Sequence, residues 1–362
     1  MNALTRSTAT AEVALTCARR RRSRWLLAIT SVVATLLGLE GSIRIYDAVR
    51  GRSWNARTYW YWAFEQDPFT GFRGRANARI ELATNFAYRH NEEGFRDDRT
   101  LHQITEVRGN RLVLCVGESS TYGLGAPSSG TAYPARLEVH LRHLSGDANW
   151  FVYNAGIPAY TSHQVVQLLR LRLLKYRPEV VVMMNLRNDV EFMARRVDEA
   201  TDFGDLPLAL APIPSPFLTE LAMRSSLFGL LATRVLRPVR PDGETATPAG
   251  PITSRGRAFY LDNLALAALV CRRTPTQLLL VDQPIFNEGY EPSRRKATAE
   301  MREAMKATAR ENDVPLLEAD RPLHVSGFAS PNEVHLGPVG YDKLAEILAP
   351  QVLEALRGRT PR

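Results

Sequence analysis

The sequence predicts an α/β fold in which helices cover both faces of a parallel sheet, preceded by an N-terminal transmembrane helix. Short apolar runs with the length of buried strands alternate with segments of helical periodicity from residue 111 onward. Strands that alternate with helices form βαβ units, and such units build a parallel sheet. An uncharged stretch from Trp25 to Leu39 directly follows a block of arginines, which is typical of a helix that spans a membrane.

The composition is that of a globular protein with a full-sized core. The chain has 362 residues, of which 45% are hydrophobic and 23% are charged. Arginines before residue 25 supply much of the formal net charge of +8, so the remainder gives no indication of nucleic-acid binding. The three cysteines, Cys17, Cys115 and Cys271, lack the number and spacing of a disulfide framework or a zinc site. We therefore expect neither a metal nor a cofactor.

The apolar stretch from Trp25 to Leu39 is a little shorter than the ~20 residues that a full span needs. Extension of the span to residue 43 brings it close to that length and places Glu40 near the far interface. A cleaved signal peptide has a similar start but ends in an Ala-x-Ala-like site, which is absent here. The sequence therefore favours a retained signal anchor over residues 25–43.

The arginine block sets the orientation of this anchor. Because positive charges stay in the cytoplasm, we expect residues 1–24 to form a basic cytoplasmic tail. The rest of the chain then lies outside the inner (cytoplasmic) membrane, in the periplasm. The membrane is thus one predicted partner, contacted through residues 25–43.

Residues 44–110 form an extracytoplasmic lead-in without a long periodic pattern. Its aromatic cluster is expected to form either a packing skirt or an interfacial belt just beyond the membrane, and it comprises Trp54, Tyr59, Trp60, Tyr61, Trp62 and Phe64. Two short strands are predicted at Arg79–Leu82 and Phe86–Arg89. Asn91–Asp97 is predicted to be a turn that leads into the main domain.

Residues 111–358 carry the alternating pattern of the main domain. The predicted strands are Leu112–Val116, Trp150–Asn154, Glu179–Met184, Gln277–Val281 and Val314–Leu317. The predicted helices are Ala132–Leu144, His163–Tyr176, 257–272, 294–311 and Val339–Leu356. Residues 190–256 interrupt the pattern as a proline-rich insertion, which includes a helix at Leu218–Val235. Proline and charge break this insertion too often for a second membrane span.

Polar residues follow three of the predicted strands and converge on one edge of the sheet. These groups are Gly117-Glu118-Ser119, Asn154-Ala155-Gly156 and Asn188-Asp189, with His335 before the last helix. A serine at this edge is a nucleophile, a phosphate ligand or a helix cap. Gly123 and Gly125 lack the Gly-Lys-Ser/Thr of a phosphate-binding loop. Acyl transfer needs a serine, a histidine base and fixed oxyanion donors, and this set provides all three.

The order of these groups resembles the SGNH/GDSL hydrolases. Gly117-Glu118-Ser119 is similar to the Gly-Glu-Ser variant of the first block, and Gly156, Asn188 and His335 occupy the central positions of the other three blocks. The resemblance implies a flavodoxin-like three-layer α/β/α fold, with Ser119 as nucleophile and His335 as base. It also implies an oxyanion hole made by the Ser119 and Gly156 N–H groups with the Asn188 side chain. The segment Asn91–Arg96 resembles the Asn-x-x-Gly-Phe-Arg lead-in of membrane-anchored bacterial members.

Two positions depart from the family pattern. The glycine two places before the third-block asparagine is Leu186, and the acid of the last block is Asn332. An amide orients an imidazole but does not stabilise the imidazolium by charge. Glu333 is adjacent but offset by one position. The catalytic set implied by the resemblance is therefore Ser119, His335 and Asn332, with the character of a Ser–His dyad.

We therefore expect a serine esterase that acts on an ester of the cell envelope, either an O-acylated glycan or a lipid, through an acyl-serine. A polysaccharide O-acyltransferase would use the same residues. A non-catalytic SGNH-like envelope protein is the alternative that Asn332 favours. His324 is a second candidate base, whereas His140 and His143 are expected to be solvated histidines without partner carboxylates.

Overall fold

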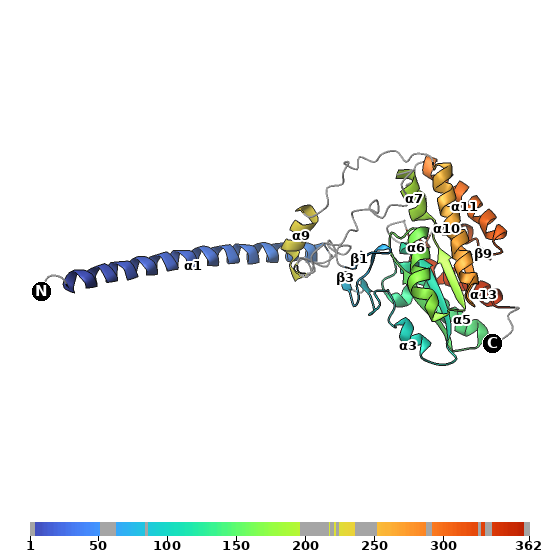
Figure 1. Ribbon diagram of the computed structural model, residues 1–362, viewed down its shortest axis with the longest axis horizontal. Coiled ribbons are helices and arrows are strands. Elements are labelled where there is room, and N and C mark those ends of the chain that lie inside the picture. The colour runs from blue at the N-terminus through green and yellow to red at the C-terminus, as the bar shows by residue number, and fades with distance from the viewer. Residues whose placement is uncertain are drawn as a thin grey trace. The chain divides into compact units, whose positions relative to one another are not determined.

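A computed structural model describes residues 4–50, 63–83, 86–195, 217, 221, 224–235, 252–286, 292–324, 327–329 and 335–357. The chain divides into two compact units, which are described separately. One unit contains the N-terminal helix and residues 215–236, and the other contains the sheet and its helices (Figure 1).

The second unit is built on a five-stranded parallel sheet. Its strands are β5 (Arg111–Gly117), β6 (Trp150–Gly156), β7 (Val180–Met184), β8 (Gln277–Val281) and β9 (Leu316–Leu317). The order across the sheet is β6-β5-β7-β8-β9, and every neighbouring pair is parallel. The chain order reverses at β5, which places the carboxyl end of β5 where open α/β sheets bind their ligands. The predicted α/β fold with a parallel sheet is confirmed.

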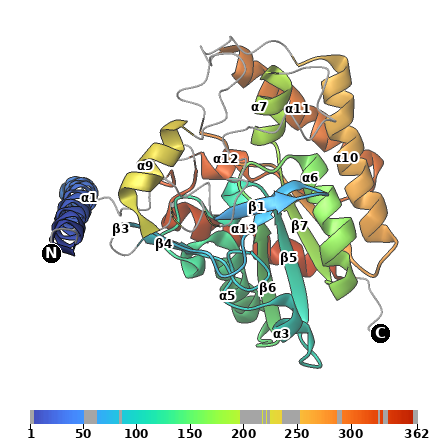
Figure 2. The ribbon, with the colours of Figure 1, turned by 60° about the vertical axis from the view of Figure 1, so that its left-hand side comes forward.

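Helices cover both faces of this sheet. One face carries α6 (Ser162–Leu168), α10 (Ser254–Arg272) and α11 (Pro292–Glu311), and the other carries α5 (Tyr133–Ser145) and α13 (Pro338–Ala355). These helices surround the strands in Figure 2. Side chains of β5 alternate between the two layers, with Leu114 and Val116 in one core and Val113 and Cys115 in the other.

Part of the predicted lead-in packs into the same core. It forms the antiparallel pairs β1 (Phe64–Asp67) with β2 (Gly71–Gly74) and β3 (Arg79–Ala83) with β4 (Phe86–Arg89), followed by α3 (Leu101–Thr105). The predictions of β3 and β4 are confirmed, whereas β1 and β2 carry too few apolar residues to be recognised. Phe64 is fully buried among core aromatics, so of the two predicted roles it has the packing one and is not part of an interfacial belt. The five other aromatics of that cluster lie outside the described residues.

In two segments the helices of the structure differ from those predicted from the sequence. The segment expected as one helix from His163 to Tyr176 is α6 followed by a π-helical turn and a 3₁₀ turn, and it ends at Arg177 in a left-handed conformation. The group Asn188-Asp189, expected in a loop, lies in the first turn of α7 (Arg187–Arg195), whose side chains reach the core. A short helix, α12 (Asp320–Leu323), was not predicted.

The first unit contains α1 (Leu4–Val49) and α9 (Ser226–Val235), which pack against each other. Within α1, Arg21–Val49 is long and apolar enough to cross a membrane. A membrane anchor and a signal sequence share this property. Helix α9 falls within the predicted helix Leu218–Val235.

Candidate active site

Ser119 stands at the first position of a short helix, α4 (Ser119–Tyr122), which begins two residues after the end of strand β5. The turn between them depends on Gly117, whose φ of 153° lies in the region that favours glycine. A Cβ at this position would lie 2.3 Å from the carbonyl oxygen of Met184 and 2.4 Å from Oγ1 of Thr121. Glycine therefore lets the chain turn sharply and present Ser119 at the edge of the sheet.

His335 meets this serine from the other end of the sequence. Its Nε2 lies 2.8 Å from Oγ of Ser119, and both side chains are 8% exposed. The adjacent Leu336 pairs with Ala329 and is buried below α13, which fixes the backbone that carries the histidine. The structure thus brings the two residues together at hydrogen-bond distance, as proton transfer requires.

No acid among the described residues bonds the other ring nitrogen of His335. Nδ1 is buried and makes no hydrogen bond to any part of the chain that the structure describes. Burial, and then the positive charge of Arg187, lower the pKa of His335 to about 3. The imidazole is therefore neutral at pH 7, with little stabilisation of its protonated form. Asn332, implied for this position, and Glu333 lie outside the described residues.

Two of the predicted oxyanion donors, the Gly156 N–H and the Asn188 side chain, differ in whether all their hydrogens already make hydrogen bonds. The Gly156 N–H donates to Oδ1 of Asn154 at 3.0 Å, so this donor is already engaged. Gly156 is nonetheless required, since a Cβ there would lie 2.3 Å from the backbone nitrogen of Tyr122. Nδ2 of Asn188 donates to the carbonyl of Tyr160 at 3.1 Å, and its second hydrogen has no acceptor within the described part of the chain.

Sequence reasoning missed a buried network that ties Glu118 to Gln283. Nε2 of Gln283 donates to Oε1 of Glu118 and, at 3.0 Å, to Oγ of Ser120. Oε1 of Gln283 accepts from the N–H groups of Leu186 and Arg187 at 3.1 and 3.0 Å. The second oxygen of Glu118 accepts the Asn188 N–H at 2.9 Å. The network therefore holds the turns after β5, β7 and β8 in one arrangement. The only signal in the sequence was the position of Gln283 just after a strand.

Two carboxyl groups near this edge have strongly shifted pKa values. Burial raises the pKa of Glu118 to about 8, although the hydrogen bonds from Gln283 and Asn188 oppose the shift. Burial raises the pKa of Asp189 to about 7, against hydrogen bonds from Ser162. Asp189 accepts both the N–H and the hydroxyl of Ser162 at the start of α6. It therefore joins α7 to α6.

Arg96, which lies in the lead-in, forms hydrogen bonds with the buried chain segment that follows Ser119. The side chain is 1% exposed and donates to the carbonyls of Tyr122, Gly123 and Ala126, which follow Ser119 in the chain. Its guanidinium also stacks 4.3 Å from the ring centre of Tyr88. These contacts give the Asn-x-x-Gly-Phe-Arg segment a physical role, because its arginine fills the hydrogen-bonding needs of the buried loop after α4.

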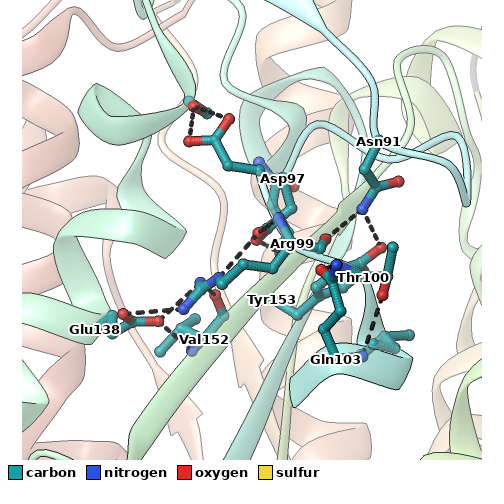
Figure 3. Close-up of polar contacts among 12 residues, drawn as sticks. Asn91, Asp97, Arg99, Thr100, Gln103, Glu138, Val152 and Tyr153 are labelled. Carbon is teal, nitrogen blue, oxygen red and sulfur yellow. Dashed lines mark hydrogen bonds and ion pairs between the residues drawn. The ribbon is translucent and has the colours of Figure 1, made fainter. Parts of the chain in front are cut away.

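The neighbouring part of this segment is fixed on β6 (Figure 3). Nδ2 of Asn91 donates to the hydroxyl of Tyr153 at 2.8 Å and to the carbonyl of Arg99. The Arg99 guanidinium reaches the carboxylate of Glu138 at 2.9 Å and the carbonyl of Val152. The lead-in is thereby anchored to the strand that carries Gly156.

The remaining histidines have other surroundings. His324 stacks on Phe286, with ring centres 5.5 Å apart, at the end of α12. Nε2 of His140 lies 3.1 Å from Asp342 of α13, which also binds Arg136. The expectation that His140 lacks a partner carboxylate is therefore wrong, because the sequence does not show that α5 and α13 are neighbours.

Comparison with known proteins identifies the family. The model of the GDSL-like lipase/acylhydrolase family matches residues 115–343, which include Ser119, Gly156, Asn188 and His335. The chain belongs to this family. Its members are ester hydrolases, and the chain is an ester hydrolase by class. No curated protein matches the chain.

Solved structures with detectable similarity are distant. A lipase/acylhydrolase from Enterococcus faecalis is 15% identical, with a TM-score of 0.44 and coverage of 69% of this chain and 100% of the other. A putative GDSL-like lipase from Parabacteroides merdae is 13% identical, with a TM-score of 0.45 and coverage of 68% and 95%. An acetylxylan esterase from Geobacillus stearothermophilus is 17% identical, with a TM-score of 0.43 and coverage of 69% and 97%.

Proposed function

We propose that the protein hydrolyses an ester of the cell envelope through an acyl-enzyme on Ser119, with His335 as general base. The single observation that carries this proposal is the 2.8 Å distance between Oγ of Ser119 and Nε2 of His335. The pKa of about 3 keeps the His335 imidazole neutral at physiological pH, as a general base must be, but it also makes the imidazole a weak base, which is consistent with slow turnover.

The reaction follows from these positions. Oγ of Ser119 attacks the ester carbonyl carbon while Nε2 of His335 takes the hydroxyl proton, which requires the tautomer with hydrogen on Nδ1. The tetrahedral intermediate collapses, the C–O bond breaks, and the alcohol leaves with the proton from His335. Water then attacks the acyl-serine by the same proton transfers in reverse.

The developing oxyanion needs donors that are fixed before the reaction. Ser119 is the first residue of α4, and the first N–H groups of a helix have no acceptor within that helix. The Ser119 N–H, at the start of α4, therefore supplies one donor. The free hydrogen on Nδ2 of Asn188 supplies a second donor. The Gly156 N–H contributes only if it leaves Oδ1 of Asn154, so we assign it the smallest share.

Among the described residues Nδ1 of His335 has no hydrogen-bond partner, and this favours a second candidate function, a non-catalytic envelope protein on the same fold. When the residue that orients a catalytic histidine is lost, the rate falls by up to about 10⁴ because the wrong tautomer forms. A dyad with slow turnover and a binding protein with none are therefore the two readings to separate.

We propose that residues 25–43 span the membrane with the basic tail in the cytoplasm, so that the catalytic unit lies in the periplasm, next to envelope esters; the length and apolar character of this helix support the proposal. An O-acylated glycan or a lipid ester is the substrate class that we propose. Transfer of the acyl group to a polysaccharide hydroxyl would use the same acyl-serine, with that hydroxyl in place of water.

The test uses the full-length chain in detergent, a fluorophosphonate probe and p-nitrophenyl acetate. We expect labelling and release of p-nitrophenol that Ser119→Ala abolishes, while the neighbouring variant Ser120→Ala keeps the label. An acceptor hydroxyl that yields an acylated product would identify a transferase. If wild type and Ser119→Ala are equally unreactive with both reagents, the protein is not a serine hydrolase.

A further inference from the structure

The C-terminal part of α1 packs against α9 (Figure 1). Glu40 of α1 accepts hydrogen bonds from the first residues of α9. Oε1 of Glu40 accepts the Ser226 N–H at 2.9 Å. Oε2 accepts the Leu227 N–H at 2.8 Å and the Ser225 hydroxyl at 2.9 Å. One carboxylate therefore satisfies three donors at the start of a helix that is 186 positions away in the chain.

Arg44 completes this contact one turn further along α1. Its Nε lies 2.6 Å from Oε1 of Glu40, and its Nη2 donates to the carbonyl of Arg224 at 2.9 Å. The first two charged residues that follow the apolar stretch of α1 are thus hydrogen-bonded to the segment that begins α9.

Helix α9 itself is apolar. Its sequence, Ser-Leu-Phe-Gly-Leu-Leu-Ala-Thr-Arg-Val, contains no acidic residue and no lysine. Leu231 is 50% exposed, and Phe217, which precedes the helix, is 73% exposed. The exposed side chains of α1 next to Glu40, such as Leu36 and Leu39, are apolar as well. The apolar surface of α1 therefore continues onto α9.

The contacts of Glu40 meet two physical requirements that a membrane interface imposes. A carboxylate at the edge of a short apolar span is unfavourable unless it has partners, and here α9 and Arg44 provide them. The first N–H groups of a helix have no intrahelical acceptor, and a water-poor interface does not supply one. Glu40 meets both requirements with one set of contacts.

We propose that α9 is a second membrane-contacting element, which lies in the outer interface beside the end of α1 and is held there by Glu40. Its exposed apolar side chains contact the boundary between lipid headgroups and acyl chains. This inference rests on the proposed span of α1.

The test measures the surroundings of three single cysteines in the full-length chain, in phosphatidylcholine vesicles and in a Cys17→Ser background. The sites are Leu231→Cys in α9, Leu36→Cys in α1 and Val139→Cys in α5, whose side chains are 50%, 49% and 49% exposed. Each carries a nitrobenzoxadiazole label. Doxyl-labelled lipid quenches a label in the membrane, and iodide quenches a label in water.

We expect the labels at 231 and 36 to be quenched by doxyl lipid and protected from iodide, and the label at 139 to show the reverse. Glu40→Leu should return the label at 231 to iodide access and leave the label at 36 unchanged. If the label at 231 behaves like that at 139 in the wild-type background, α9 does not contact lipid. If Glu40→Leu leaves the label at 231 in lipid, Glu40 does not hold the helix.

Two further measurements distinguish a failure of this inference from a failure of the proposed span of α1 or of the proposed enzyme activity. Iodide access at position 36 would overturn the span of α1, and the membrane contact of α9 with it. Fluorophosphonate labelling of Ser119 in the same vesicles reports on the proposed enzyme independently of where α9 lies.

Discussion

The network at Gln283 gives a sharp prediction because two substitutions of similar shape should behave differently. Gln283→Leu removes the partners of the Leu186 and Arg187 N–H groups and of one oxygen of Glu118. A buried polar group left without a partner costs about 1–3 kcal/mol. Three such groups, with partial relaxation of the backbone, lower the free energy of unfolding by at least about 3 kcal/mol.

Gln283→Glu keeps an acceptor for both N–H groups but places a second carboxyl against Glu118. Burial already raises the pKa of Glu118 to about 8, so at pH 6 the pair retains a proton and forms an O–H···O bond. A group with a raised pKa stabilises the fold most at low pH, and this stabilisation is lost as pH rises through the folded-state pKa. The variant should therefore be close to wild type at pH 6 and should lose stability and labelling rate between pH 6 and 9.

The assay is denaturant unfolding of the full-length chain in detergent at both pH values, with fluorophosphonate labelling rates on the same samples. We expect Gln283→Leu to be impaired at every pH and Gln283→Glu to be impaired only at high pH. Wild-type stability in Gln283→Leu, or identical pH dependence in Gln283→Glu and wild type, would refute the reasoning.

Three further predictions concern the same site. Arg96→Lys keeps the charge but not the fork that binds three carbonyls, so thermal unfolding should show a loss of about 2 kcal/mol or more, and an unchanged melting temperature would argue against this role. Since burial lowers the pKa of His335 to about 3, the acid limb of the labelling rate should lie well below pH 6.5, and a midpoint near 6.5 would contradict the assigned environment. Gly156→Ala should displace the backbone of Tyr122 and cost about 1–3 kcal/mol. Gly130→Ala, where the nearest atom to a new Cβ is 3.9 Å away, should be near neutral, and equal effects of the two alanines would contradict the packing argument.

The parallel sheet was predictable because its strands are continuous apolar runs. Gln277–Val281 was predicted with the limits that the structure gives, and β5 and β7 were predicted within one residue at each end. Strands buried on both faces have no need to alternate apolar and polar residues, so their composition alone identifies them. The hairpin of β1 and β2 was not predicted because each strand has only four residues and contains no continuous run of apolar residues.

The local sequence also predicted which groups converge at the site, but it did not predict which hydrogen bonds these groups form. The proximity of Ser119 and His335 follows from the topology, since both stand at the carboxyl edge of the sheet. The engagement of the Gly156 N–H by Asn154 depends on one side-chain rotamer, and the Glu118–Gln283 network depends on the neighbouring positions of β5, β7 and β8. The pairing of α9 with Glu40 joins positions too far apart for any local pattern to indicate.

The central claim is that Ser119 forms an acyl-enzyme with His335 as the general base. The most direct measurement is pre-steady-state reaction of the full-length chain with p-nitrophenyl acetate, followed by mass mapping of the acid-quenched protein. We predict a burst of p-nitrophenol, an acetyl group on the peptide that contains Ser119, and acylation slowed by about 10²–10⁴ in His335→Ala. An acetyl group on another residue, or equally fast acylation in His335→Ala, would contradict the claim.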